Sequence, residues 1–167
     1  MNPYFRQMEH PKHTPTDLDA TDVEILRKLQ ADAKTTMKDL AAELGLSVSP
    51  VYERIRRLED KGFIKQYVAI LDNKLLGRSV TAICQVSMRY HDESFIEQFE
   101  RDIMGMNEVQ ECYHIGGPVD FMLKINVGSL EEYHDFVKYK LSKIGNIGTL
   151  NSAFVLKEIK QGFAYSI

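Results

Sequence analysis

The hydrophobic residues between positions 36 and 64 recur every three or four positions, in two runs separated by a glycine. The first run supplies the apolar face of one helix: Met37, Leu40, Ala41 and Leu44. Gly45 follows where the chain must turn sharply, because a residue without a Cβ adopts a positive φ at little cost. The second run places Val51, Ile55 and Leu58 on one stripe of a helix from about Val48 to Asp60. This pattern is typical of a helix-turn-helix.

Polar residues at the helix starts support the same interpretation. The Thr36 hydroxyl is expected to accept from the amide of Asp39 while the Asp39 carboxylate reaches back, as in a shortened capping box. Ser47 is the expected N-cap of the second helix, with its side chain bonded at Ser49. Pro50 lies in the first turn, where its missing amide hydrogen is harmless.

The second helix turns a polar face away from its apolar stripe. The candidate DNA contacts are Ser47, Ser49, Glu53, Arg54, Arg56 and Arg57. Arg54 falls on the flank of this face, and Arg57 is the better candidate for a base edge. An isolated basic run is often only a solvated helix face with surface ion pairs. Here the caps, the glycine turn and the buried stripe agree, which favours a recognition helix that offers guanidinium groups to DNA.

Further elements flank this pair of helices. Residues 18–30 predict one more helix, capped by Asp17 or Asp19, with Ile25, Leu26 and Leu29 facing inward. Residues 65–71 alternate as a short strand, and residues 72–77 form a linker with turn chemistry. Three helices make a minimal DNA-binding domain over residues 18–64, followed by a strand and hinge linker over 65–78.

From Ser79 onward the period of the pattern changes. The alternating strands begin with residues 80–88 and continue with 109–115, 121–127 and about 149–157. Helical spacing occurs in residues 95–103 and again after Ser129, where Ser129 and Glu132 form a capping box. The order β-α-β-β-α-β is that of a ferredoxin-like domain, with both helices on one face of an antiparallel sheet. The predicted fold class is therefore α+β, with an N-terminal helix-turn-helix (winged-helix-like) domain and a ferredoxin-like domain over residues 79–167.

The helices leave the second face of this sheet uncovered. No further helices remain in the sequence to cover it, so a second copy of the same sheet is the expected cover and the protein is expected to form a homodimer. The distribution of charge also favours a dimer. The chain of 167 residues has a net charge of −3, and residues 1–75 hold 12 Lys and Arg against 12 Asp and Glu. The basic patch is local and modest, so tight DNA binding needs two or more copies of the module.

The remaining composition excludes several classes of protein. Cys84 and Cys112 lie far apart in predicted strands, as buried thiols of a reduced cytosol. No apolar run has the length of a membrane span, and the N-terminus has no apolar signal core, so a cytoplasmic protein is expected. Residues 1–17 are expected to be a flexible arm. His10 and His13 in this arm could bind a metal, but a polar tail is the favoured interpretation, and no cofactor is expected.

The sequence resembles the Lrp/AsnC (feast/famine) family of prokaryotic transcription regulators from about Leu18 to the C-terminus. Three runs carry the resemblance: LDATDVEILRKLQADAKTTMKDLAAELGLS, ERIRRLEDKGFI and VLKEIKQG. The resemblance implies double-stranded DNA as partner, assembly of dimers that commonly associate to octamers, and a small effector, usually an amino acid, bound by the second domain between dimers.

The resemblance also implies an effector loop in HIGGPVDF. The family's glycine, followed three residues later by an acid, matches Gly117 and Asp120. Exposed amides of such a turn can hold an α-carboxylate, and the acid can hold an α-ammonium. Gly116 and Pro118 depart from the family pattern, and Pro118 removes an amide. His114 and Ser142 match positions that line the pocket in family members, and they complete the candidate site. A simple hairpin turn remains the alternative.

Two other functions stay open. Siroheme decarboxylases share this architecture and would use histidines and arginines to hold the carboxylates of their substrate. In this sequence His91, His114 and His134 form no evident cluster. A basic recognition helix would also have no use in such an enzyme. No enzymatic activity is therefore expected. The other alternative is an architectural DNA-compacting protein without an effector, which only ligand sensitivity distinguishes from a local regulator.

Overall fold

The described part of the chain, residues 18–167, folds into two compact units in this computed structural model. The first unit contains residues 18–70 together with 160–167, and the second contains residues 71–159. The C-terminal residues 160–167 thus belong with the helical unit and not with the sheet, in contrast to the division expected from the pattern. The predicted arm, with His10 and His13, lies outside the described residues.

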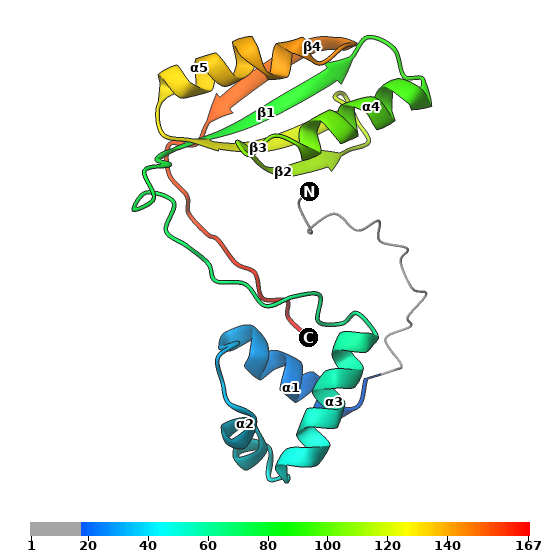
Figure 1. Ribbon diagram of the computed structural model, residues 1–167, viewed down its shortest axis with the longest axis vertical. Helices are drawn as coiled ribbons and strands as arrows, with labels where there is room; N and C mark the ends of the chain where they lie inside the picture. Colours follow the sequence, from blue (N-terminus) through cyan, green and yellow to red (C-terminus); the bar gives the residue numbers. More distant parts are fainter. Residues whose placement is uncertain (1–17) are drawn as a thin grey trace. The chain divides into compact units, whose positions relative to one another are not determined.

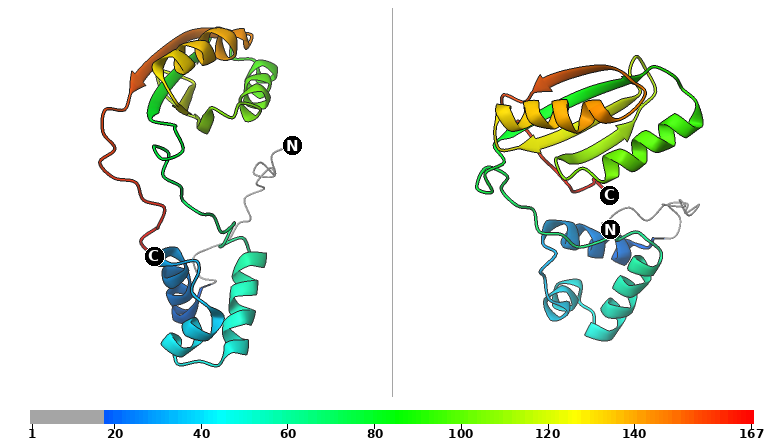
Figure 2. Two further views of the ribbon diagram at one scale, coloured as in Figure 1. Left: turned by 60° about the vertical axis from the view of Figure 1, so that its left-hand side comes forward. Right: turned by 45° about the horizontal axis from the view of Figure 1, so that its top comes forward.

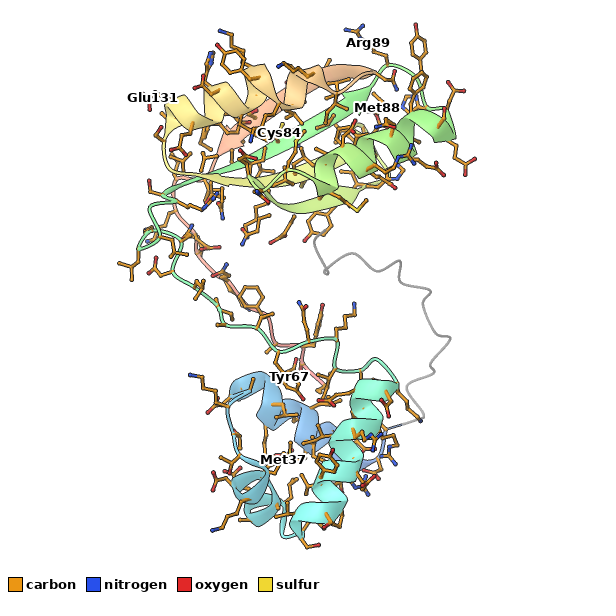
Figure 3. All side chains as sticks on the ribbon, viewed as in Figure 1. Met37, Tyr67, Cys84, Met88, Arg89 and Glu131 are labelled. Carbon is orange, nitrogen blue, oxygen red and sulfur yellow. The ribbon has the colours of Figure 1, made fainter. Side chains whose placement is uncertain are left out.

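Three helices form the first unit: α1 (Ala20–Ala31), α2 (Met37–Leu44) and α3 (Val48–Asp60) (Figure 1). Its core consists of the predicted apolar positions, Ile25, Leu26, Leu40, Ala41, Val51, Ile55 and Leu58. Met37 packs against this core as a partly buried residue (Figure 3). The helical periods read from the sequence are therefore confirmed.

The helix caps differ from the predictions in detail. Asp19 caps α1 in a reciprocal capping box with Asp22. Thr36 accepts from the Asp39 amide as expected, but the Asp39 carboxylate takes the Thr36 hydroxyl at 2.6 Å rather than the backbone, so the reciprocal cap predicted there is wrong. The side-chain cap predicted for Ser47 is also absent. A serine cap bonds to the second or third amide of its helix. Pro50 removes the third, and nothing in the structure explains why Ser47 does not bond to the second, that of Ser49.

Gly45 ends α2 in the left-handed conformation, with φ 66°. An added Cβ at this position would meet nothing within 4 Å, so a substitution there is disfavoured only by the backbone conformation. Gly45→Ala is expected to lower the free energy of unfolding by about 1 to 2 kcal/mol, the cost of a left-handed L-residue. Urea denaturation of the full chain measures this loss. Gly145→Ala, which adds the same methyl group in open space without a positive φ, is expected to leave stability unchanged.

The strand predicted over residues 65–71 is absent, and these residues form no regular element. A strand needs a neighbour for its backbone amides and carbonyls. The described residues of this single chain provide none beside 65–71. The turn predicted at 72–77 is present, with the Arg78 amide bonded to the Asn73 carbonyl.

The second unit is a four-stranded antiparallel sheet with strand order β2-β3-β1-β4. Its elements follow the predicted order: β1 (Val80–Met88), α4 (Glu93–Met104), β2 (Val109–His114), β3 (Phe121–Val127), α5 (Leu130–Tyr139), the short 3₁₀ helix η2 (Leu141–Lys143) and β4 (Ile147–Phe154). Both long helices lie on the same face of the sheet (Figure 2, right). The ferredoxin-like arrangement is confirmed.

One face of the sheet and the inner sides of α4 and α5 form the core of this unit. Ala82, Cys84, Val86 and Met88 of β1 are buried there, as their alternation predicted. Cys84 and Met88 are labelled in Figure 3. The cap of α5 is shifted from its prediction. Ser129 accepts from the Glu132 amide, but the Glu132 carboxylate accepts from the Gly128 amide, one residue before the expected donor.

Candidate DNA interface and effector loop

The outer face of α3 is exposed because Val51, Ile55 and Leu58 point into the core. Ser49, Glu53 and Arg56, three of the predicted contact residues, are exposed on it, and Ser47 is exposed at its start. Arg56 has no hydrogen bond or ion pair with any residue of the described chain.

Tyr52, which sequence reasoning missed, belongs to the same face. Its side chain is 50% exposed, although an aromatic ring of this size is usually more buried. The signal that could have found it is its spacing, because it lies four residues before Arg56 on the helix. An exposed aromatic ring beside a guanidinium offers apolar and polar contacts to DNA.

Arg54 and Arg57 lie closer to α1 than the helical wheel suggested. Nη1 of Arg54 donates to Asp19 at 2.5 Å and to Asp22 at 2.7 Å, and Nη2 of Arg57 donates to Asp22 at 2.6 Å and 2.8 Å. The hydrogen bond to Arg54 lowers the pKa of Asp19. These two arginines therefore join α3 to α1 as well as contributing positive charge to its flank.

The predicted effector loop connects β2 to β3. Its ends are held by a bond from the Ile115 amide to the Asp120 carbonyl at 2.9 Å. Between them Gly116, Gly117 and Pro118 are exposed, and Gly117 has φ 146°, a conformation that L side chains rarely adopt. The loop is therefore a tight hairpin with an exposed glycine backbone.

Asp120 fastens this loop to the end of β1. Its carboxylate accepts from the Met88 amide at 2.7 Å and lies 3.0 Å from Nε2 of His91. Met88 is labelled in Figure 3 at this end of the strand. The Asp120 side chain is 22% exposed and that of His91 is 64% exposed, so the His91 ring is the more accessible of these two side chains. Sequence reasoning did not connect His91 with the loop.

The other two predicted effector residues have partners of their own. The His114 ring stacks on Phe121 with centroids 4.6 Å apart, and its Nδ1 lies 3.8 Å from Glu100. The Ser142 hydroxyl donates to the Lys138 carbonyl at 2.7 Å. Both side chains remain exposed, but neither makes a hydrogen bond or ion pair with the glycine turn within the described residues.

The two cysteines are free thiols in the sheet. Cys84 is fully buried, and Cys112 is partly buried rather than fully buried as expected. Burial, with a contribution from Glu100, raises the pKa of Cys112 to about 11, which keeps the thiol protonated and poorly reactive. Within residues 18–167, no group of three or more His, Cys, Asp or Glu side chains is placed to hold a metal ion.

Comparison with known proteins identifies both units. Residues 81–165 match the model of the Lrp/AsnC ligand binding domain, and residues 18–65 match a winged helix-turn-helix DNA-binding model. The chain belongs to the Lrp/AsnC family. This assignment confirms the resemblance read from the sequence and makes the chain a transcriptional regulator with a DNA-binding and a ligand-binding domain.

Individual relatives cover most of this Lrp/AsnC chain. The Bkd operon transcriptional regulator of Pseudomonas aeruginosa is 34% identical over 86% of the chain and 94% of its own length. The leucine-responsive regulatory protein of Haemophilus influenzae is 31% identical over 96% of each. A transcriptional regulator of Neisseria meningitidis, solved as an L-methionine complex, superposes with a TM-score of 0.85 at 31% identity, over 89% of this chain and 96% of that one.

In the described part of the chain, no helix is long and apolar enough to cross a membrane.

Proposed function

We propose that this Lrp/AsnC chain binds specific sites on double-stranded DNA through α3 and that a small effector, an amino acid, changes its assembly and DNA affinity. The observation that carries the proposal is the outer face of α3, where the exposed Arg56 has no partner among the described residues. An exposed guanidinium without an intramolecular partner on a recognition helix suits phosphate oxygens and guanine edges. Ser47, Ser49 and Glu53 complete the proposed contacts, with Arg54 and Arg57 on the flank.

The effector is proposed to bind at the loop of residues 116–120. The exposed amides of its glycine turn suit an α-carboxylate, and Asp120 suits an α-ammonium that replaces the exposed His91 ring on its carboxylate. Ile115, Val119 and Met122 nearby favour an apolar side chain. The L-methionine complex of the Neisseria meningitidis regulator supports this ligand class. His114 and Ser142 stay candidates for the pocket wall.

A homodimer is proposed to form through the sheet face that the helices leave open. The strand register places a mixed set of side chains on this face: Thr81, Ile83, Gln85, Glu111, Tyr113, Met122, Lys124, Asn126, Asn151 and Ala153. Several polar members already bond to one another, such as Thr81 with Asn126 at 2.7 Å and Lys124 with Glu111 at 3.1 Å. A polar face with satisfied hydrogen bonds and apolar side chains between them can be buried against a second copy. Octamers of such dimers are proposed as the larger assembly.

Ile83→Asp is expected to separate the proposed dimer. The change places an unpaired charge at the centre of the interface and raises the dissociation constant by roughly 100-fold. Light scattering at micromolar concentration measures the mass. Leu130→Asp, at an exposed position where α5 begins, is expected to leave the mass unchanged. A wild-type monomer under these conditions, or an Ile83→Asp variant that still forms dimers, contradicts the interface.

A ligand screen tests the proposed function as a whole. Each standard amino acid, with L-methionine first, is added to the full chain, and both the melting temperature and the affinity for DNA are followed. A ligand that binds only the folded state raises the melting temperature by mass action. The proposal expects an apolar amino acid to raise it and to change the DNA affinity in the same concentration range. DNA binding that no amino acid alters would instead favour the architectural, effector-independent function.

A further inference from the structure

Asp22 is a buried carboxylate in the helix-turn-helix unit. Its side chain is 1% exposed, and it is the only charged side chain buried to this extent in the part of the chain that the structure describes. A carboxylate in such a place is unfavourable unless it is paired and hydrogen-bonded. A role in helix capping alone does not require this burial, because Asp19 caps the same helix from a half-exposed position.

The partners of Asp22 come from the recognition helix. Oδ1 accepts from Nη1 of Arg54 at 2.7 Å and from Nη2 of Arg57 at 2.8 Å, and Oδ2 accepts from the same Nη2 at 2.6 Å. The Asp19 amide adds a weaker bond to Oδ2 at 3.3 Å. One carboxylate of α1 thus fixes two guanidinium groups that lie one turn apart on α3.

The two arginines are fixed to different degrees. Arg54 bridges Asp19 and Asp22, and its side chain is 27% exposed. Arg57 is held through Nη2 alone, and its side chain is 46% exposed. Its Nε and Nη1 groups have no hydrogen bond with residues 18–167. Arg54 therefore anchors α3 to α1, whereas Arg57 is held at one corner and presents its other donors to solvent.

We propose that Asp22 is a positioning residue of the DNA interface, which holds the Arg57 guanidinium in one orientation so that its remaining N–H groups meet a base edge or phosphate. The inference rests on the proposed contact between Arg57 and DNA. A long arginine side chain loses rotamer freedom when it binds, and a side chain already ordered in the unbound protein loses less. Arg56, which lacks such a partner, contributes charge without this preorganisation.

The experiment compares Asp22→Asn with Glu24→Gln, a matched control two residues along α1 that removes an exposed carboxylate paired with Arg27 and Lys28. The DNA probes are a duplex selected from a random library by the wild-type protein and poly(dI-dC) as non-specific competitor. Asp22→Asn is expected to weaken binding to the selected duplex about 10-fold and to change non-specific binding less than about 2-fold. The control is expected to match the wild type on both.

A double-mutant cycle separates positioning from simple stabilisation. In an Arg57→Ala background, Asp22→Asn is expected to cause a further loss of less than about 2-fold on the selected duplex, because Arg57 is already gone and Arg54 keeps its bond to Asp19. Losses that multiply, or an Asp22→Asn variant with wild-type affinity, overturn the inference. Unchanged binding by Arg57→Ala alone overturns instead the proposed DNA contact itself.

A measurement on the unmodified protein covers the case in which Asp22→Asn does not fold. Nitrogen-15 relaxation of the arginine Nε–H groups reports how rigid each side chain is in the absence of DNA. The Nε–H of Arg57 is expected to be nearly as rigid as the backbone, and that of Arg56 clearly more mobile. Equal mobility of the two side chains in the free protein overturns the positioning role.

Discussion

Replacing Arg56 and Arg57 together with alanine is expected to weaken binding to a specific DNA site by about 2 to 6 kcal/mol, since each such contact contributes about 1 to 3 kcal/mol. Both side chains are exposed on α3, and neither contributes to the apolar stripe that folds the unit. The loss is measured by fluorescence anisotropy on a duplex selected by the wild-type protein. The dependence of affinity on salt is expected to weaken too, because fewer phosphates are neutralised.

The matched control for this prediction is Arg101→Ala. Arg101 lies on α4 in the other unit, is 54% exposed and pairs with Glu97 at 3.3 Å, so its replacement removes a comparable surface charge. It is expected to leave specific affinity unchanged. If the Arg56 and Arg57 variant retains wild-type affinity and salt dependence, or if Arg101→Ala loses as much, then α3 is not the recognition helix.

The architecture of both units was predictable because it follows from local periodicity. Val51, Ile55 and Leu58 recur at helical spacing and are buried, and the alternation around Cys84 correctly gives the core face of β1. The strand predicted for residues 65–71 is absent for a related reason. Alternation shows that a segment suits a strand, but only a neighbouring strand makes it one. No described residue forms backbone strand pairing with residues 65–71.

The side-chain contacts of the site were less predictable. A helical wheel gave the direction of Arg57 from its helix axis, but its guanidinium bonds to Asp22, 35 residues earlier in the chain. Likewise the glycine turn was found by its spacing, while the bond between Asp120 and His91 joins residues 29 positions apart. Long polar side chains reach across elements, and such pairs have no periodic signal in a single sequence.

The effector loop is tested by Asp120→Asn, which is expected to abolish the response to an amino acid while leaving effector-free DNA binding intact. Asparagine keeps an oxygen that can accept from the Met88 amide, so the fastening of the loop to β1 is retained. Alanine would leave that amide without its acceptor and is the poorer test, since an unsatisfied buried donor costs about 1 to 3 kcal/mol. Asparagine removes the negative charge that the proposed α-ammonium needs, together with the second oxygen, which faces His91.

His91→Ala is the companion variant for this prediction. It removes the exposed ring from the Asp120 carboxylate but leaves the charge in place, so amino-acid binding is expected to be retained or strengthened. Calorimetric titration gives the affinities, beginning with L-methionine, and anisotropy with and without the amino acid gives the coupling to DNA. That coupling is reciprocal, so DNA must change the amino-acid affinity of the wild type by the same factor. An Asp120→Asn protein that binds the amino acid as tightly as the wild type would show that the effector binds elsewhere, and the glycine turn would then be only a hairpin.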